Sequence, residues 1–204
     1  MQNQQRTIRL RQLVSRLNKT RRLQEKKIDI LCNDLISAHR SFIKGLRSLS
    51  FAADFYESII GKANTEELLR TATYLIKKEL DVSDVVFFLR RDRGFELFGN
   101  QNTKKESDLA LESYFSTELI DNICKSNALL SLNDMLEMGL DVSPAVLSRI
   151  SAFAMPLSRG GTSAGFILIY RFDSRELTIS ELKNITSITT GLAGAVAACT
   201  ANSN

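Results

Sequence analysis

Apolar residues recur at alternating spacings of three and four from Leu10 to Ile59. This is the spacing of the a and d positions of a coiled coil, whose apolar side chains line one narrow face of a helix. No proline interrupts the segment. We therefore predict one long helix over 10–59, whose narrow stripe needs a second helix to cover it. The stripe consists of Leu10, Val14, Leu17, Arg21, Gln24, Ile28, Leu31, Leu35, Ala38, Phe42, Gly45, Leu49, Ala52, Tyr56 and Ile59.

The stripe differs in quality along its length. Arg21 and Gln24 are polar, whereas the positions from Ile28 onward are mostly apolar. Polar residues at a and d positions cost stability or fix register, so we expect a firm coil after Ile28 and a looser or partner-dependent segment before it. The alternative is a helix folded against its own domain. That alternative is strongest after Phe42, where the apolar face widens with Phe51, Phe55, Tyr56 and Ile60.

The remaining chain alternates between helical and strand patterns. Gly61 ends the long helix, and a polar cap at Asn64 opens a second helix that runs to Leu80. The other predicted elements are a strand at 85–89, a turn at 92–94, a strand at 95–98, a polar loop at 99–107, a helix at 109–125, a weak strand at 128–132, short helices at 133–140 and after 143, strands at 150–157 and 164–172, and a helix at 178–199. Strands that pair as hairpins between helices predict an α+β fold. We place a coiled-coil dimerisation helix at 1–61 and a globular domain at 62–204.

Composition is that of a water-soluble globular protein, with 44% hydrophobic and 25% charged residues among 204. The sequence contains no run of 18 apolar residues, so it predicts no membrane span. The first residues lack the apolar core of a secretory signal. Three widely spaced cysteines are typical of reduced thiols. We expect a cytoplasmic protein.

Charge is distributed unevenly between the two parts of the chain. Residues 1–50 carry 12 Lys and Arg against three acidic residues, a net charge of +9, and residues 51–204 carry a net charge of −5. The basic residues are concentrated before Ile28. Such a block forms a solvated helix face or meets an acidic partner protein, nucleic acid or an anionic membrane surface.

The order of these elements resembles that of GAF domains, the small-molecule sensor modules of signalling proteins. The resemblance covers about Thr65 to Ala201. It rests on the segment from Glu66 to Leu89, with Asp81-Val82-Ser83-Asp84 before an apolar strand, and on a later hairpin with Met155-Pro156-Leu157 and Gly165-Phe166-Ile167-Leu168. A coiled coil before such a domain also looks like the DUF484-type architecture.

The resemblance implies a ligand pocket between one sheet face and the middle helices. Its candidate residues are Phe98, Tyr114, Phe115, Met135, Met138, Arg149, Phe153 and Met155. Arg149 is the residue among them whose positive charge could bind an anionic group of a ligand. Pockets and ordinary cores are both mostly apolar, so a simple hydrophobic core is the alternative interpretation of this set.

Chemistry-bearing motifs are absent from the sequence. The single histidine, His39, lies in the long helix, so a nucleophile with a histidine base is not available in the domain. No phosphate-binding glycine loop and no closely spaced metal ligands occur. The bilin-attachment, haem-ligating and cyclic-nucleotide signatures of specialised GAF domains are not found either. We therefore expect no catalytic residues, no metal and no cofactor, with an unidentified small molecule as the ligand class left open.

These observations predict a non-enzymatic regulatory protein. We expect a homodimer whose interface includes Leu17, Ile28, Leu31, Leu35, Ala38, Phe42, Leu49, Leu182, Ile185, Leu192 and Val196. No output domain follows Asn204, so we expect a partner protein to carry the output. Two alternatives stay open: a scaffold whose domain binds no ligand, and a regulator whose basic helix contacts nucleic acid, although that helix lacks interleaved aromatic residues.

Overall fold

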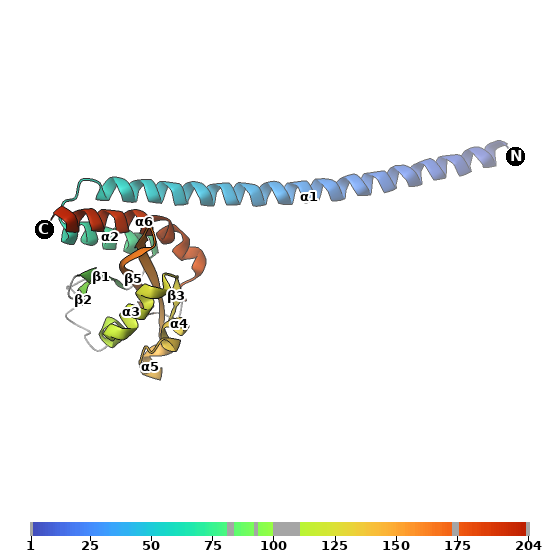
Figure 1. The fold of residues 1–204 in the computed structure, drawn as a ribbon. Coiled ribbons are helices and arrows are strands. Elements are labelled where there is room, and N and C mark those ends of the chain that lie inside the picture. The colour runs from blue at the N-terminus through green and yellow to red at the C-terminus, as the bar shows by residue number, and fades with distance from the viewer. Residues whose placement is uncertain (1, 81–83, 92–93, 100–110, 173–175, 203–204) are drawn as a thin grey trace. The chain divides into compact units, whose positions relative to one another are not determined.

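The computed structural model describes residues 2–80, 84–91, 94–99, 111–172 and 176–202. Figure 1 shows the elements in the order α1 (Gln2–Ile59), α2 (Thr65–Leu80), β1 (Asp84–Arg91), β2 (Gly94–Phe98), η1 (Leu111–Tyr114), α3 (Thr117–Ser126), β3 (Leu130–Ser131), α4 (Leu132–Glu137), α5 (Pro144–Leu147), β4 (Ile150–Arg159), β5 (Thr162–Phe172) and α6 (Ile179–Asn202). The predicted turn at Asp92 and Arg93 and most of the predicted loop at 99–107 lie outside the described residues.

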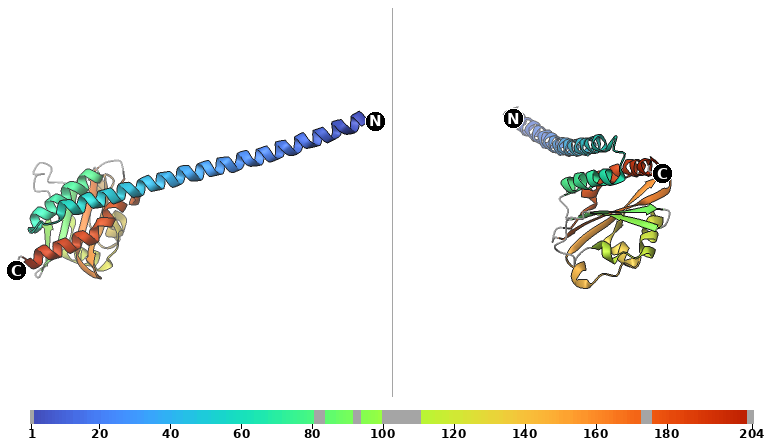
Figure 2. Two further views of the ribbon diagram at one scale, coloured as in Figure 1. Left: turned by 90° about the horizontal axis from the view of Figure 1, so that it is seen from above. Right: turned by 90° about the vertical axis from the view of Figure 1, so that its left-hand side faces the viewer.

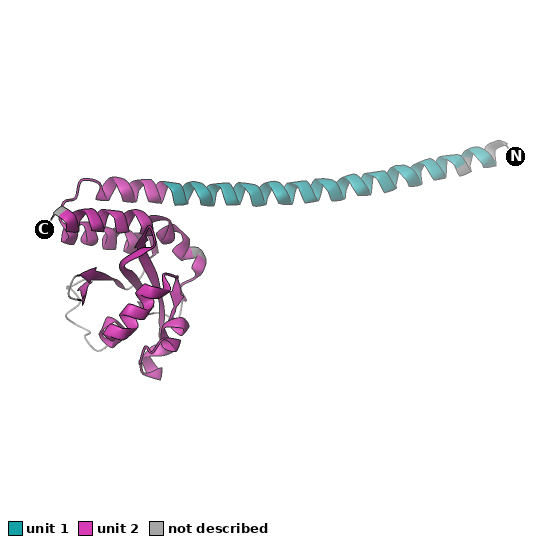
Figure 3. Ribbon diagram, in the orientation of Figure 1, with its two compact units in different colours: residues 1–49 teal, residues 50–204 magenta. Residues whose placement is uncertain are grey.

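The chain divides into two compact units, residues 1–49 and 50–204 (Figure 3). The first unit is a single helical segment. It belongs to α1, a continuous helix of 58 residues. The long N-terminal helix is therefore confirmed, and it begins at Gln2, earlier than the predicted start at Leu10.

The second unit is built on a five-stranded sheet with the order β2-β1-β5-β4-β3. Every pair of neighbouring strands is antiparallel. The predicted hairpin of β4 and β5 forms around Gly160 and Gly161, whose positive φ angles of 59° and 84° suit glycine in a tight turn. The sheet with its flanking helices confirms the α+β fold.

Alternating side chains of the central strands enter two separate cores, one on each face of the sheet. Val85, Phe87 and Leu89 point to the face covered by α2, α6 and the end of α1. Val86 and Phe88 point to the opposite face, which is covered by η1, α3, α4 and α5. Figures 1 and 2 show these helical layers on the two sides of the sheet.

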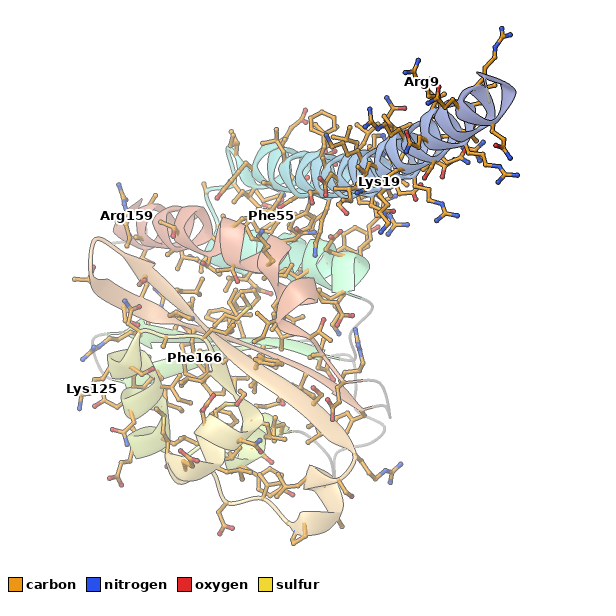
Figure 4. The ribbon with its side chains drawn as sticks, turned by 90° about the vertical axis from the view of Figure 1, so that its right-hand side faces the viewer. Arg9, Lys19, Phe55, Lys125, Arg159 and Phe166 are labelled. Carbon is orange, nitrogen blue, oxygen red and sulfur yellow. The ribbon has the colours of Figure 1, made fainter. Side chains whose placement is uncertain are left out.

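The last residues of α1 belong to the core of the second unit. Phe55 is fully buried and Ile59 is 4% exposed, and both pack with residues of α2 and α6 (Figure 4). Here the alternative of a helix folded against its own domain is what the structure shows. Gly61 then ends the segment with φ 81°, and the Asn64 side chain caps α2 by accepting a hydrogen bond from the Glu66 amide at 2.8 Å.

The middle of the domain differs from the prediction in one respect. Positions 109 and 110 of the predicted helix at 109–125 lie outside the described residues. The remainder is not continuous: η1 ends at Tyr114, and α3 starts at Thr117. Ser116 is the reason, because its hydroxyl accepts a hydrogen bond from the Leu119 amide at 3.2 Å and caps a new helix.

Four residues of α6 that we expected at a dimer interface lie in the core instead. Leu182, Ile185 and Leu192 are fully buried within one chain, and Val196 is 4% exposed. They pack toward the sheet and α2. Within one chain these four side chains therefore leave almost no surface for a second copy to contact.

Candidate functional site

Three phenylalanines form a stacked cluster on the sheet face beneath η1 and α3. The ring centroids of Phe88 and Phe166 lie 4.6 Å apart at 14°, and Phe115 stacks on Phe88 at 5.2 Å. Phe166 is fully buried and Phe88 is 3% exposed. Figure 4 shows Phe166 between the layers of the domain. The rings fill the middle of the face on which the GAF resemblance implies a pocket.

A buried tyrosine and a carboxylate meet at the edge of this aromatic cluster. The Tyr170 hydroxyl, on a residue only 1% exposed, donates a hydrogen bond to Glu112 Oε2 at 2.7 Å. Burial raises the pKa of Tyr170 far above its ordinary value, and the Glu112 carboxylate raises it further. Tyr170 therefore acts as a neutral donor, and it joins strand β5 to η1.

The same tyrosine is connected to the other helical layer through the neighbouring strand. Asp84 of β1 stands opposite Tyr170 in the sheet register, and it also contributes to the raised pKa of that tyrosine. Asp84 Oδ1 accepts from Lys77 Nζ of α2 at 3.1 Å. Polar contacts thus run from α2 through β1 and β5 to η1.

Cys124 lies on the inner side of α3 and is 3% exposed. Burial raises the pKa of its thiol, and a contact with the Ser163 side chain opposes this only in part. A thiol that stays protonated is a poor nucleophile and a poor metal ligand. The structure therefore gives Cys124 the environment of a core residue.

The predicted pocket residues are distributed over both faces of the sheet. Tyr114, Phe115, Met135 and Met138 pack with the core beneath η1, α3 and α4. Phe98, Phe153 and Met155 pack with the opposite core, beneath α2 and α6. Arg149 is exposed in the turn after α5. The eight residues therefore do not line one cavity. The alternation of side chains along β4 directs Phe153 and Met155 to the face covered by α2 and α6, and Phe98 of β2 packs on that same face.

A shallow surface depression of about 380 Å³ lies where the end of α1 meets α6. Tyr56, Ile59 and Ile60 form one wall, and Gly191, Ala195 and Ala198 form the other. It lacks charged side chains other than that of Lys62. Its walls have no arrangement of polar groups that would orient a small molecule.

The predicted stripe on α1 is exposed within a single chain from Leu17 to Leu49. The exposed fractions are 63% for Leu17, 58% for Ile28, 65% for Leu31, 71% for Leu35, 63% for Phe42 and 67% for Leu49, and Ala38 is also exposed. Basic side chains such as Arg9 and Lys19 project from the same helix (Figure 4). Large uncovered apolar side chains at regular spacing mark an interaction surface.

Comparison with solved structures decides the fold. The GAF domain of a phosphoenolpyruvate-protein phosphotransferase from Coxiella burnetii superposes with a TM-score of 0.59 at 16% identity, over 78% of this chain and 97% of that one. The GAF domain of the corresponding Acinetobacter enzyme gives 0.58 at 12% identity, over 78% and 98%. Residues 122 to 287 of a methyl-accepting chemotaxis protein give 0.52 at 12% identity, over 74% and 97%. The domain has the GAF fold.

Sequence comparison adds no narrower assignment to this GAF-fold domain. No family model matches the chain, and no curated protein matches it. At identities of 12–16% the similarity concerns the fold.

The described residues show neither a candidate metal site nor a candidate membrane span. Among the residues that the structure describes, no three His, Cys, Asp or Glu side chains are grouped so as to hold a metal ion. No described helix combines the length and the apolar character that a membrane crossing needs.

The hydrogen bond between Tyr170 and Glu112 was not among the contacts predicted from the sequence. A signal for Tyr170 was present, because a tyrosine inside an apolar strand needs a hydrogen-bond partner once it is buried. No local pattern pointed to Glu112 as that partner, since the two residues are 58 positions apart.

Proposed function

We propose that this chain is a non-enzymatic regulatory protein that works as a parallel homodimer. In this proposal, α1 pairs with α1 of a second copy, and the GAF-fold domain responds to a small molecule or a partner protein. The observation that carries the proposal is the stripe from Ile28 to Leu49, whose large apolar side chains are 58–71% exposed in one chain.

The energetic reason for pairing is the apolar area that the stripe leaves in water. Burying one such side chain fully stabilises by about 1.5–3 kcal/mol. Five large side chains of the stripe lie between Ile28 and Leu49 at coiled-coil spacing. Knobs-into-holes packing against the same stripe of a second copy covers all of them with one symmetric contact.

The regulatory role rests on the fold and on the names of its structural neighbours. One neighbour is the GAF domain of a phosphotransferase, and another is a chemotaxis protein. We infer that the signal leaves this chain through a partner protein. No disulfide joins the three cysteines, which supports a place in the reducing cytoplasm.

A ligand-free scaffold is the second candidate, and the aromatic cluster favours it. The stacked rings of Phe88, Phe115 and Phe166 occupy the space in which a sensor would hold its ligand. Native mass spectrometry of gently purified protein separates the two candidates. A reproducible small adduct supports the sensor, and a clean mass together with a co-purifying protein supports the scaffold.

Light scattering tests the pairing on which both candidates depend. We expect a dimer mass for the wild type at micromolar concentration and a monomer mass for Leu31→Glu/Leu35→Glu, because two carboxylates per chain would be buried in the stripe. The matched control, Asn33→Glu/Ser37→Glu, adds the same charge at positions facing away from the stripe and stays dimeric. A monomeric wild type would contradict the proposal.

A further inference from the structure

A second stripe runs along the N-terminal third of α1. Its residues follow one another at spacings of three and four. All of them are basic or apolar except Thr20. The second stripe consists of Arg9, Leu13, Arg16, Thr20, Leu23, Lys27 and Ile30. It holds the g and c positions of the heptads whose a and d positions form the first stripe. At 100° per residue, its centre lies about 100° around the helix from the first stripe.

The apolar members of the second stripe are uncovered. Leu13 is 58% exposed, Leu23 is 54% exposed and Ile30 is 59% exposed. Pairing two copies through the a and d positions leaves the c positions of Leu23 and Ile30 on the outside of the coil. A dimer therefore still presents the c positions of this line to a third helix, while Leu13 and Lys27, at g positions, flank the dimer seam.

The second stripe is confined to the basic part of the helix. After Ile30 the same heptad positions hold Asp34, Ser37 and Ser41, so the apolar character stops. Further along, these positions hold Phe51 and Phe55, which pack in the core of residues 50–204. At that end the line is covered by the chain's own domain, and in the described part of residues 9–30 nothing covers it.

Charges along this segment lack partners. Among its described residues only Arg21 has a carboxylate within ion-pair distance, at 2.9 Å from Glu25. Among the described residues of 50–204, by contrast, six cations sit beside carboxylates: Lys62, Arg70, Lys77, Arg91, Lys125 and Arg171. Arg9, Arg16 and Lys27 therefore carry positive charge beside exposed apolar side chains.

The combination of unpaired cations with exposed apolar side chains argues against three possible partners of the second stripe. Phosphates of a nucleic acid would need the charge but would leave Leu13, Leu23 and Ile30 in water. Helices that lie in a membrane surface present aromatic and apolar residues on one wide face, whereas no aromatic residue precedes Phe42 and the second stripe alternates with cations. In the proposed dimer the second copy occupies the first stripe, and on the second stripe it would bring cations rather than carboxylates to Arg9, Arg16 and Lys27.

We propose that the second stripe binds an acidic amphipathic helix of a partner protein. Leucine-type residues of that helix pack on Leu13, Leu23 and Ile30, and its Glu or Asp side chains pair with Arg9, Arg16 and Lys27. The inference rests on the proposed function, since it assigns the first stripe to the homodimer and the second to the output partner.

Fluorescence anisotropy with a synthetic probe tests this docking. The probe is a fluorescein-labelled helical peptide of about four heptads, with Leu at a and d and Glu at the flanking positions, added to the full-length protein. Arg9→Glu/Arg16→Glu/Lys27→Glu weakens binding at least tenfold, and so does Leu13→Ser/Leu23→Ser. The control Lys19→Glu/Arg22→Glu/Lys26→Glu changes the charge equally but lies off the stripe, and it weakens binding less than threefold.

Several results would overturn the inference. The first is that the peptide does not bind the wild type. The second is that the two charge variants lose equal amounts of peptide affinity. The third is that a DNA duplex or anionic vesicles bind more tightly than the peptide. Light scattering on the same samples keeps the two proposals apart. A monomeric wild type refutes the homodimer, whereas the dependence of peptide binding on Leu13 and Leu23 decides the second stripe.

Discussion

Tyr56 lies over Gly191 so closely that a Cβ atom at position 191 would stand within 3.0 Å of the tyrosine ring. The Tyr56 hydroxyl also donates to the Ser187 carbonyl at 3.5 Å. This contact joins the end of α1 to α6. It shows why a helix rich in small residues is needed at this point, since only glycine leaves room for the ring.

Substitution of Gly191 tests that contact. Alanine at position 191 improves helix propensity by about 1 kcal/mol, but packing its Cβ against the Tyr56 ring costs about 1–3 kcal/mol. Gly191→Ala therefore lowers the free energy of unfolding by about 1 kcal/mol. In a Tyr56→Ala background the same change raises it by about 1 kcal/mol. Urea denaturation of the four proteins measures this cycle. The control is Gly194→Ala, whose Cβ has its nearest neighbour at 3.8 Å and which should stabilise the wild type. Equal effects at 191 and 194 would refute the contact.

The buried pair of Tyr170 and Glu112 supports a second prediction. Tyr170→Phe removes the donor and leaves a half-buried carboxylate oxygen unsatisfied, so the free energy of unfolding falls by about 1–2 kcal/mol at neutral pH. Tyr74→Phe is the control, because Tyr74 is 66% exposed, and it should change stability by less than about 0.5 kcal/mol. Urea midpoints of both variants and the wild type provide the measurement, and equal midpoints for all three would contradict a stabilising role of this hydrogen bond.

The raised pKa of Tyr170 makes stability depend on alkaline pH. In the unfolded chain this phenol loses its proton near pH 10, while in the folded protein it keeps the proton. The unfolded state then binds fewer protons, so stability falls as the pH rises above about 10. Denaturation series between pH 8 and pH 11 should show a smaller fall for Tyr170→Phe than for the wild type. Parallel curves would show that Tyr170 ionises normally.

Thiol reactivity gives a fourth prediction. Cys32 is exposed on α1, while Cys124 and Cys199 are each 3% exposed, and burial raises the pKa of Cys124. A thiol reagent at pH 7.5 should therefore modify one cysteine per native chain quickly and three in denaturant. The variant Cys32→Ser should lose the fast phase entirely. Rapid reaction of a second native thiol would contradict the packing of α3 or α6.

Strands and helices were predictable where the chain's own periodicity defines them. The run from Val85 to Leu89 and the hairpin around Gly160 indicated their strands directly, and Asn64 indicated the start of α2. The division of α3 from η1 was missed because the capping role of Ser116 depends on one side-chain hydrogen bond. An apolar pattern over 109–125 does not contain that information.

Assignments that depend on what covers a surface were less predictable. The stripe of α6 has the same spacing of three and four as that of α1, yet Leu182 and Leu192 are buried by the domain's own sheet. Periodicity reports which face is apolar, but it does not say whether a second chain or the same chain covers it. The candidate pocket failed to assemble for a related reason, since Phe153 and Met155 point to the opposite side of the sheet from Met135.

Spin labels on α1 test the parallel pairing most directly. Lys19→Cys and Arg47→Cys, made singly in a Cys32→Ser background, occupy equivalent outward heptad positions about 42 Å apart along one helix. A parallel dimer in register places like labels within roughly 35 Å of each other at both positions, since paired helix axes lie about 10 Å apart. Pulsed electron paramagnetic resonance should therefore give a short distance for each variant. Distances well above this at both positions would indicate antiparallel pairing, and no dipolar signal at either position would contradict the dimer.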